Sequence, residues 1–138
     1  MKRTEGWRDR LGLFIQSRYG RPFSWGSNDC AMFAADAIKE MTGTDMAEKF
    51  RGYQEPPGRA VAKSLEHIME HVCPIFGLQE IPSYMALAGD LVLLENPDKK
   101  LWPHALGIVG TNGEPVTVRP DEGVVSVPPE LIARAWRV

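Results

Sequence analysis

The chain has 138 residues, of which 43% are hydrophobic and 25% are charged, a composition typical of an ordinary globular domain. At this length a single domain with a core of its own is expected. The formal net charge of −2 argues against nucleic acid as a partner, and no run of 18 apolar residues predicts a membrane span.

The N-terminus and the cysteines bear on the compartment. The first ten residues are charged and no apolar segment follows them, so we expect no secretory signal peptide. The two cysteines, Cys30 and Cys73, are too few for a disulfide framework and indicate a reducing compartment. Cys73 precedes Pro74 at the end of a predicted helix, and we interpret it as a packing residue.

The chain is helical in its first half and rich in strands in its second. Apolar residues at helical spacing predict three helices, at residues 4–19, 30–41 and 59–72. Short apolar runs between turn residues predict an antiparallel meander of five strands, at 91–94, 105–109, 116–119, 124–127 and 133–138. The prediction is therefore one α+β domain over residues 1–138, helical over 1–73 and sheet-forming over 89–138.

The most informative segment is 25–30, which reads Trp-Gly-Ser-Asn-Asp-Cys, because a helical pattern begins at Cys30. The small polar residues before it supply possible N-caps. Cys30 then lies in the first turn of a helix, where unpaired N–H groups and the helix dipole favour a thiolate and stabilise an oxyanion. The alternative is that Cys30 is a small core residue, as most free cysteines are.

The second chemical element is His104, which follows Trp102 and Pro103 and starts the predicted strand 105–109. An imidazole at the end of a strand can deprotonate a thiol and later protonate a leaving amine. A cysteine at a helix N-terminus and a histidine on a sheet form the papain-type arrangement. The alternative is a residue that caps a loop.

In order and spacing, these segments resemble the NlpC-type cysteine peptidases, papain-like enzymes that cut peptide bonds in bacterial cell-wall stem peptides. The resemblance covers about residues 20–138 and rests on aromatic-x-Trp-Gly, Asp-Cys at a helix start, Gly-Asp-Leu-Val-Leu-Leu, and His-x-x-Gly-Ile-Val-Gly. It implies a papain-like α+β fold, with N-terminal helices packed on an antiparallel sheet of about five strands. It also implies that Cys30 is the nucleophile, that His104 is the base, and that Asp29 supports the turn.

Residues around this turn are the candidate substrate contacts. We expect Trp25, Ser27 and Asp29 to line the substrate site, and Trp25, Tyr53 and Trp102 to flank the cleft. Exposed aromatic side chains suit a peptide or a sugar-linked peptide, although core packing explains at least one of them equally well. No cofactor is implied.

Within the group, the chain resembles short proteins encoded in phage and prophage tail-gene clusters, which often end in a strand such as 135–138, Ala-Trp-Arg-Val. This implies a peptidase or amidase that reaches peptidoglycan stem peptides as part of a phage tail tip or baseplate, in contact with other tail proteins. The protein would lie in the virion tail, or in the host cytoplasm before assembly. The alternative is a structural tail component that keeps the fold with a weak or inactive triad.

The sequence offers two candidates for the residue that would orient the imidazole. The family uses a third polar residue, on the strand after the histidine, to hold the imidazole tautomer. Counting from the shared glycine gives Thr117, whereas a two-residue Asn-Gly hairpin at 112–113 places Asp121 opposite His104. Phe23 is a second departure, because the family often has a tyrosine near the cleft and phenylalanine removes its hydroxyl.

A competing metal motif lies on the third predicted helix. Residues 67–71 fit H-x-x-E-H, in which His67 and His71 share a helix face and would bind one zinc ion in a peptidase. Such a site needs a third protein ligand, and no second motif supplies one. We favour two surface histidines beside Glu70 and expect no metal.

Overall fold

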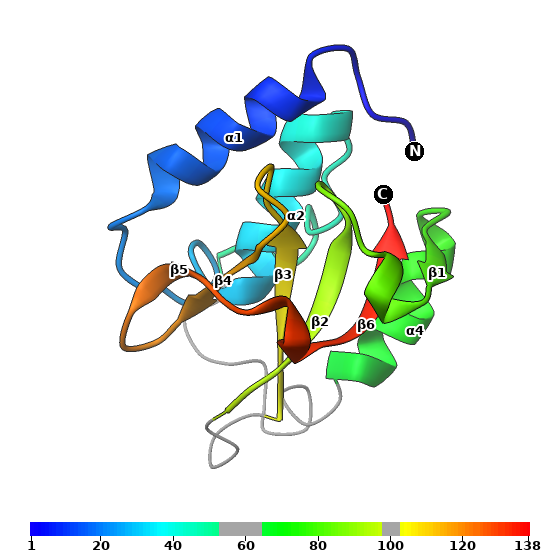
Figure 1. Ribbon diagram of the computed structural model, residues 1–138. Helices are drawn as coiled ribbons and strands as arrows, with labels where there is room; N and C mark the ends of the chain where they lie inside the picture. Colours follow the sequence, from blue (N-terminus) through cyan, green and yellow to red (C-terminus); the bar gives the residue numbers. More distant parts are fainter. Residues whose placement is uncertain (53–64, 98–102) are drawn as a thin grey trace.

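The computed structural model describes residues 1–52, 65–97 and 103–138, and Figure 1 shows helices against one antiparallel sheet. Its helices are α1 (Trp7–Arg18), α2 (Cys30–Thr42) and α4 (Leu65–Ile75). Its strands are β1 (Gln79–Ile81), β2 (Leu91–Glu95), β3 (His104–Val109), β4 (Pro115–Arg119), β5 (Gly123–Ser126) and β6 (Ile132–Arg137). Two short 3-10 helices, η1 (Ser83–Met85) and η2 (Pro129–Leu131), complete the described elements.

The helices form close to where the sequence predicts them. Helix α2 begins at Cys30 after the N-cap Asp29, and it ends at Gly43, whose φ of 81° is one that glycine adopts without strain. Helix α1 is shorter than predicted by three residues at its start and one at its end. Pro74 does not end α4, since the helix continues to Ile75, and the earlier part of that predicted helix lies outside the described residues.

The sheet has six strands in the order β1-β6-β2-β3-β4-β5, and all neighbours pair antiparallel. Strands β2 to β5 form the predicted meander, while β6 returns to the free edge of β2. The predicted α+β class is confirmed, but the count of about five strands is one too low. The extra strand, β1, is three residues long and precedes the predicted sheet region, so its sequence gives only a weak periodic signal.

The main core lies between the helices and one face of the sheet (Figure 1). Phe33, Ile38 and Met41 of α2 pack there with Leu93 of β2 and Leu106 of β3, and none of these side chains is more than 3% exposed. The opposite face carries a smaller apolar cluster that includes Val92, Leu94, Val109, Val127 and Ala135. Alternate residues of a strand therefore belong to different clusters, which fixes the face of every strand residue.

The β3–β4 hairpin differs from the predicted two-residue loop. The Gly110 N–H donates to the Glu114 carbonyl at 2.8 Å, so three residues form the loop, and Gly113 adopts a φ of 85°. This is the three-residue hairpin with glycine in the left-handed region. The register moves by one residue, and Asp121, which lies in the turn after β4, is not opposite His104.

Asp90 ties both ends of the chain to the start of β2. Its side chain is fully buried and forms ion pairs with Arg3 at 3.0 Å and Arg137 at 3.2 Å. It also accepts hydrogen bonds from the N–H groups of Leu87 at 2.9 Å and Val138 at 3.3 Å. The Gly-Asp of the family pattern thus has a structural role here, since a buried carboxylate needs such partners.

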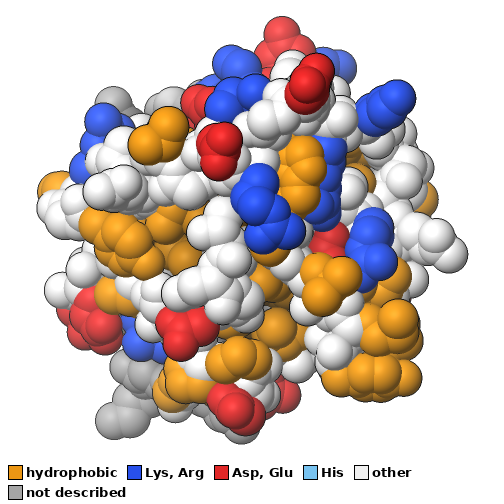
Figure 2. All heavy atoms as spheres, turned by 45° about the horizontal axis from the view of Figure 1, so that its top comes forward, with side chains coloured by type: hydrophobic (Ala, Val, Ile, Leu, Met, Phe, Trp, Pro, Cys, Tyr) orange, Lys and Arg blue, Asp and Glu red, His pale blue; other side chains and the backbone are white. Residues whose placement is uncertain are grey.

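Charges are mixed on the side of the molecule that carries α1. Figure 2 shows Lys and Arg side chains there in separate groups, interspersed with acidic and hydrophobic ones. On another side, Arg134 of β6 joins α4 to β1 through Glu66 at 3.0 Å and through Glu70 and Glu80 at 2.6 Å each. Among the described residues, none of the helices combines the length and the apolar character needed to span a bilayer.

Candidate active site

Asp29 fixes the turn that leads into α2. One carboxylate oxygen accepts a hydrogen bond from the Met32 N–H at 2.8 Å, and the other accepts one from the Gly26 N–H at 2.9 Å. The side chain is only 2% exposed. The first bond is the N-cap and the second closes the preceding turn, so together they hold Cys30 as the first residue of the helix. Asp29 therefore supports the turn, as the family resemblance implies.

The other residues of this turn have different environments. Trp25 is half-buried and packs edge-on against Phe23, with ring centroids 4.6 Å apart and an interplanar angle of 89°. Ser27 is exposed. Both Trp25 and Ser27 lie within five residues of Cys30 and remain candidate substrate contacts, whereas Tyr53 and Trp102 lie outside the described residues.

The Cys30 thiol is half-buried between α2 and β3. The pKa of this thiol is raised to about 11, mainly by burial and to a smaller extent by the nearby Asp29 carboxylate. Backbone N–H groups, above all that of Leu106 on β3 and then those of Ala31 and Cys30, favour the thiolate and act in the opposite direction. The sequence expectation of a lowered pKa is therefore wrong, because loss of hydration outweighs the helix N-terminus. The thiol is neutral at pH 7.

His104 begins β3 and lies on the same face of the sheet as the thiol. Strand residues two apart share a face, and Leu106 belongs to the core between sheet and helices. Two residues along a strand span about 6.6 Å, so the imidazole is within side-chain reach of a sulfur that meets the Leu106 N–H. The ring is half-buried, and neither nitrogen has a hydrogen-bond partner within residues 1–52, 65–97 and 103–138. Cys30 and His104 thus approach the Leu106 backbone from α2 and from the start of β3.

The structure brings neither of the two candidate orienting residues to His104. Thr117 is 2% exposed, and its hydroxyl donates to the Leu106 carbonyl at 2.7 Å. It belongs to the sheet face opposite to that of His104, because its neighbours Val116 and Val118 are the β4 residues in the helix-facing core. Asp121 is exposed in the turn after β4. The helix-facing side of β4 is therefore apolar.

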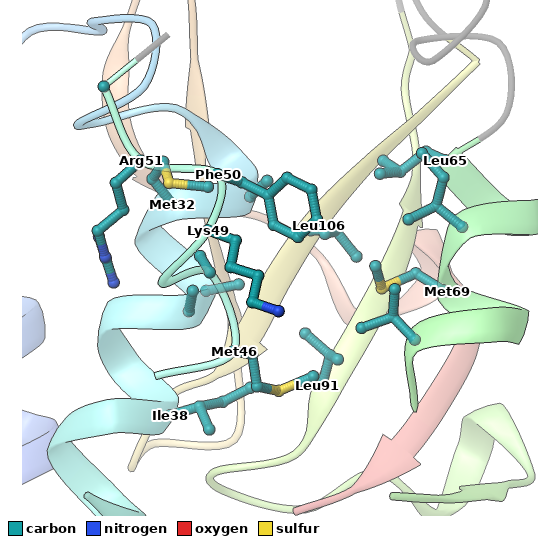
Figure 3. A pocket seen from close by; sticks show the side chains of 17 residues that line it. Met32, Ile38, Met46, Lys49, Phe50, Arg51, Leu65, Met69, Leu91 and Leu106 are labelled. Carbon is teal, nitrogen blue, oxygen red and sulfur yellow. The ribbon is translucent and has the colours of Figure 1, made fainter. Parts of the chain in front are cut away.

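A mainly apolar cavity of about 770 Å³ lies between α2 and α4 (Figure 3). Leu91 and Leu106 of the sheet, Ala31 of α2 and Met69 of α4 are among its lining residues. Lys49 and Arg51 also line this mainly apolar space. The cavity joins residues from separate parts of the chain, and local sequence patterns do not predict it.

The two histidines of the metal motif lie away from this site, on α4. The rings of His67 and His71 are 4.3 Å apart, and Nδ1 of His71 lies 2.9 Å from the His67 carbonyl oxygen. The acidic residues beside them, Glu66 and Glu70, bind Arg134. In the described parts of the chain, no three His, Cys, Asp or Glu side chains are grouped as metal ligands would be.

Cys73, the second thiol, is completely buried in the main core, and both cysteines are free. Burial raises its pKa to about 12, with a further contribution from the Glu80 charge. The predicted packing role of Cys73 is confirmed.

Comparison with known proteins places the chain in a family. Residues 2–138 match the model of a family described as "Domain of unknown function (DUF6950)". The chain belongs to this family. No match is found among curated proteins.

Solved structures identify the fold of this DUF6950 chain. It is similar to the NlpC/p60 domain of the peptidoglycan hydrolase SagA, with a TM-score of 0.59 and 19% identity over 94% of this chain and 97% of that one. It is also similar to an NlpC/p60 family protein from Bacillus cereus ATCC 10987, with a TM-score of 0.55 and 15% identity over 94% of this chain but 39% of that one. These likenesses confirm the predicted NlpC-type fold.

Proposed function

We propose that the chain is a cysteine-dependent hydrolase, a peptidase or amidase, that acts on bacterial cell-wall stem peptides. One placement supports the proposal: Cys30 begins α2 with its thiol at the Leu106 N–H, and His104 begins β3 two residues before Leu106. This is the pairing of nucleophile and base that cysteine chemistry on an amide needs. The NlpC/p60 neighbour that is called a peptidoglycan hydrolase supports the choice of substrate.

The reaction follows from the neutral thiol. As the sulfur attacks the amide carbonyl, His104 takes the thiol proton, because burial disfavours a thiolate before substrate binds. The N–H groups in the first turn of α2 stabilise the oxyanion of the tetrahedral intermediate. The imidazolium then protonates the leaving amine, which leaves an acyl thioester on Cys30. Water, deprotonated by His104, hydrolyses the thioester and restores the thiol.

The setting of this activity is also part of the proposal. The sequence resemblance to short tail-cluster proteins supports delivery by a phage tail tip or baseplate, with other tail proteins as partners. The protein would then lie in the virion tail, or in the host cytoplasm before assembly. The cavity lined by Ala31, the residue after Cys30, supports a substrate with an apolar group near the scissile bond.

Hydrolysis of purified stem peptides tests the activity. Cys30→Ala and His104→Ala should each abolish cleavage without unfolding the protein, and the double variant should be little worse than either, because the two residues act as one unit. Cys73→Ala is the matched control, since it removes the other thiol and should keep the activity. Equal cleavage by the parent and by Cys30→Ala would refute the proposal.

A second candidate function is a structural tail component that keeps this fold. It is favoured by the apolar helix-facing side of β4, where the family would place the residue that orients the imidazole. On this reading the parent protein does not cleave cell-wall peptides, and phage that carry Cys30→Ala still assemble infectious particles.

A further inference from the structure

The register of β2 on β3 places an acidic residue opposite His104. Glu95, the last residue of β2, pairs with His104, the first residue of β3. The same register continues beyond both strands, where the Asn96 N–H donates to the Pro103 carbonyl at 3.0 Å. Pro103 has no N–H to return a bond, so the ladder ends there. Glu95 and His104 are thus the last side-chain pair at this end of the sheet.

The hydrogen-bond pattern shows that this pair belongs to the close kind. In an antiparallel ladder, hydrogen-bonded pairs alternate with non-hydrogen-bonded pairs, whose Cα atoms are about 4.5 Å apart and whose side chains are nearer. The Val109 N–H donates to the Asp90 carbonyl at 3.0 Å, and the Asn96 bond lies six residues further along β2. The pairs 90/109 and 96/103 are therefore hydrogen-bonded pairs. Because the two kinds of pair alternate, the pair 95/104 is of the non-hydrogen-bonded kind.

Both side chains point to the helix-facing side of the sheet. Leu93 on β2 and Leu106 on β3, two residues from each member of the pair, belong to the core on that side. Glu95 is exposed and forms no ion pair or hydrogen bond through its side chain within the described residues. Its carboxylate is therefore available at the distance of a cross-strand pair.

Glu95 is the charged group best placed to meet the ring. Among the described residues on this side, Asp29 uses both carboxylate oxygens to accept backbone hydrogen bonds, and Lys49 and Arg51, which line the cavity, are cations that cannot accept a proton from the ring. The β4 residues on this side are apolar. Arg119, at the end of β4, pairs with Glu122 at 3.6 Å.

We propose that Glu95 is a positioning residue for His104: its carboxylate accepts a hydrogen bond from one ring nitrogen and leaves the other nitrogen free to take the Cys30 proton. The inference rests on the proposed function and supplies the orienting group that β4 lacks. A carboxylate in this role holds one tautomer and stabilises the imidazolium that forms when sulfur attacks. Here it would come from the strand before the histidine in the chain, not from the strand after it.

Two measurements on Glu95→Ala and Glu95→Gln test the proposal. Long-range proton–nitrogen NMR reports which ring nitrogen of His104 carries the proton, and His104→Ala assigns its signals among the three histidines. Kinetics on the stem peptide separate kcat from KM. Glu114→Ala is the matched control, because it removes an exposed carboxylate in the β3–β4 loop. Since Glu95 is also exposed, its variants should fold like the parent.

We expect one His104 tautomer in the parent and a mixture in Glu95→Ala, with kcat lowered about 10- to 100-fold and KM within about twofold. Glu95→Gln keeps an acceptor oxygen but no charge, so it should keep the tautomer and lose part of kcat. An unchanged tautomer in Glu95→Ala overturns the inference, even when the parent cleaves stem peptides. If Glu95→Ala loses the single tautomer but the parent cleaves no stem peptide, the contact would be supported and the proposed function refuted.

Discussion

The Cys30 thiol should react slowly with alkylating reagents at neutral pH. Its pKa is raised from 9.0 to about 11, mainly by burial. The thiolate is the reactive form, so at pH 7 its fraction falls from about 10⁻² for an ordinary thiol of that pKa to about 10⁻⁴. Iodoacetamide should therefore modify Cys30 about 100-fold more slowly than the same cysteine in the unfolded chain.

Mass spectrometry of Cys73→Ala between pH 6 and pH 11 measures this rate with a single thiol present. The rate should rise about tenfold for each pH unit up to about pH 11, since only the thiolate fraction changes. Cys30→Ala reports the second thiol, which should react more slowly still, because Cys73 is fully buried and its pKa is about 12.

One outcome would refute the statement that the Cys30 thiol is neutral at pH 7. A rate at pH 7 equal to or above that of the unfolded chain, constant between pH 6 and pH 8 and lost in His104→Ala, would show a thiolate–imidazolium pair in the free protein. The base would then have taken the proton before substrate arrives, and the order of steps proposed above would be wrong.

Three further predictions concern stability and metal. Asp29→Ala should lower the free energy of unfolding by about 2–4 kcal/mol in urea titrations, because two backbone N–H groups lose their acceptor, and Asp29→Asn should cost less because one acceptor oxygen remains. The raised pKa values of Cys30 and Cys73 favour the protonated folded state. The free energy of unfolding should thus be constant below about pH 9. As the pH rises from 9 towards 11, it should fall by about 1.4 kcal/mol per pH unit for each thiol. The fall should be smaller in Cys30→Ser, which has one thiol. Protein purified without chelator should hold no stoichiometric zinc, and one zinc per chain that is lost in His71→Ala would contradict this.

Local patterns predict the elements that carry the site because their signals are short-range. The start of α2 follows from a capping aspartate followed by helix-forming residues, and its end follows from Gly43. All five predicted strands begin and end within one residue of β2, β3, β4, β5 and β6 in the structure. The positions of Cys30 at the start of α2 and of His104 at the start of β3 could be predicted because the sequence marks both element boundaries clearly.

The third site position depends on register, which those patterns leave open. One additional residue in the β3–β4 loop shifts the pairing, so the register that would place the alternative candidate, Asp121, opposite His104 does not form. The pairing of β2 with β3 spans the segment between residues 96 and 103, which is too long for a two-residue hairpin whose turn would fix the register. Glu95 therefore had no sequence signal. The raised thiol pKa was missed for a similar reason, since burial results from packing of α2 against β3.

The raised pKa of Cys30 and the position of Glu95 opposite His104 are connected through the base. A thiol that is neutral at rest makes the reaction depend on a base that can accept its proton during attack, and such a base needs a partner that holds its ring and stabilises its charge. With an apolar β4 and no other group, His104 would be a poor base, and the chain would suit the structural role better than the enzymatic one. With Glu95 engaged, a complete nucleophile, base and orienting residue exists on α2, β3 and β2. The enzymatic role thus requires the contact between Glu95 and His104, which the tautomer measurement tests without any assumption about the substrate, and cleavage of stem peptides then separates an enzyme from a structural homologue.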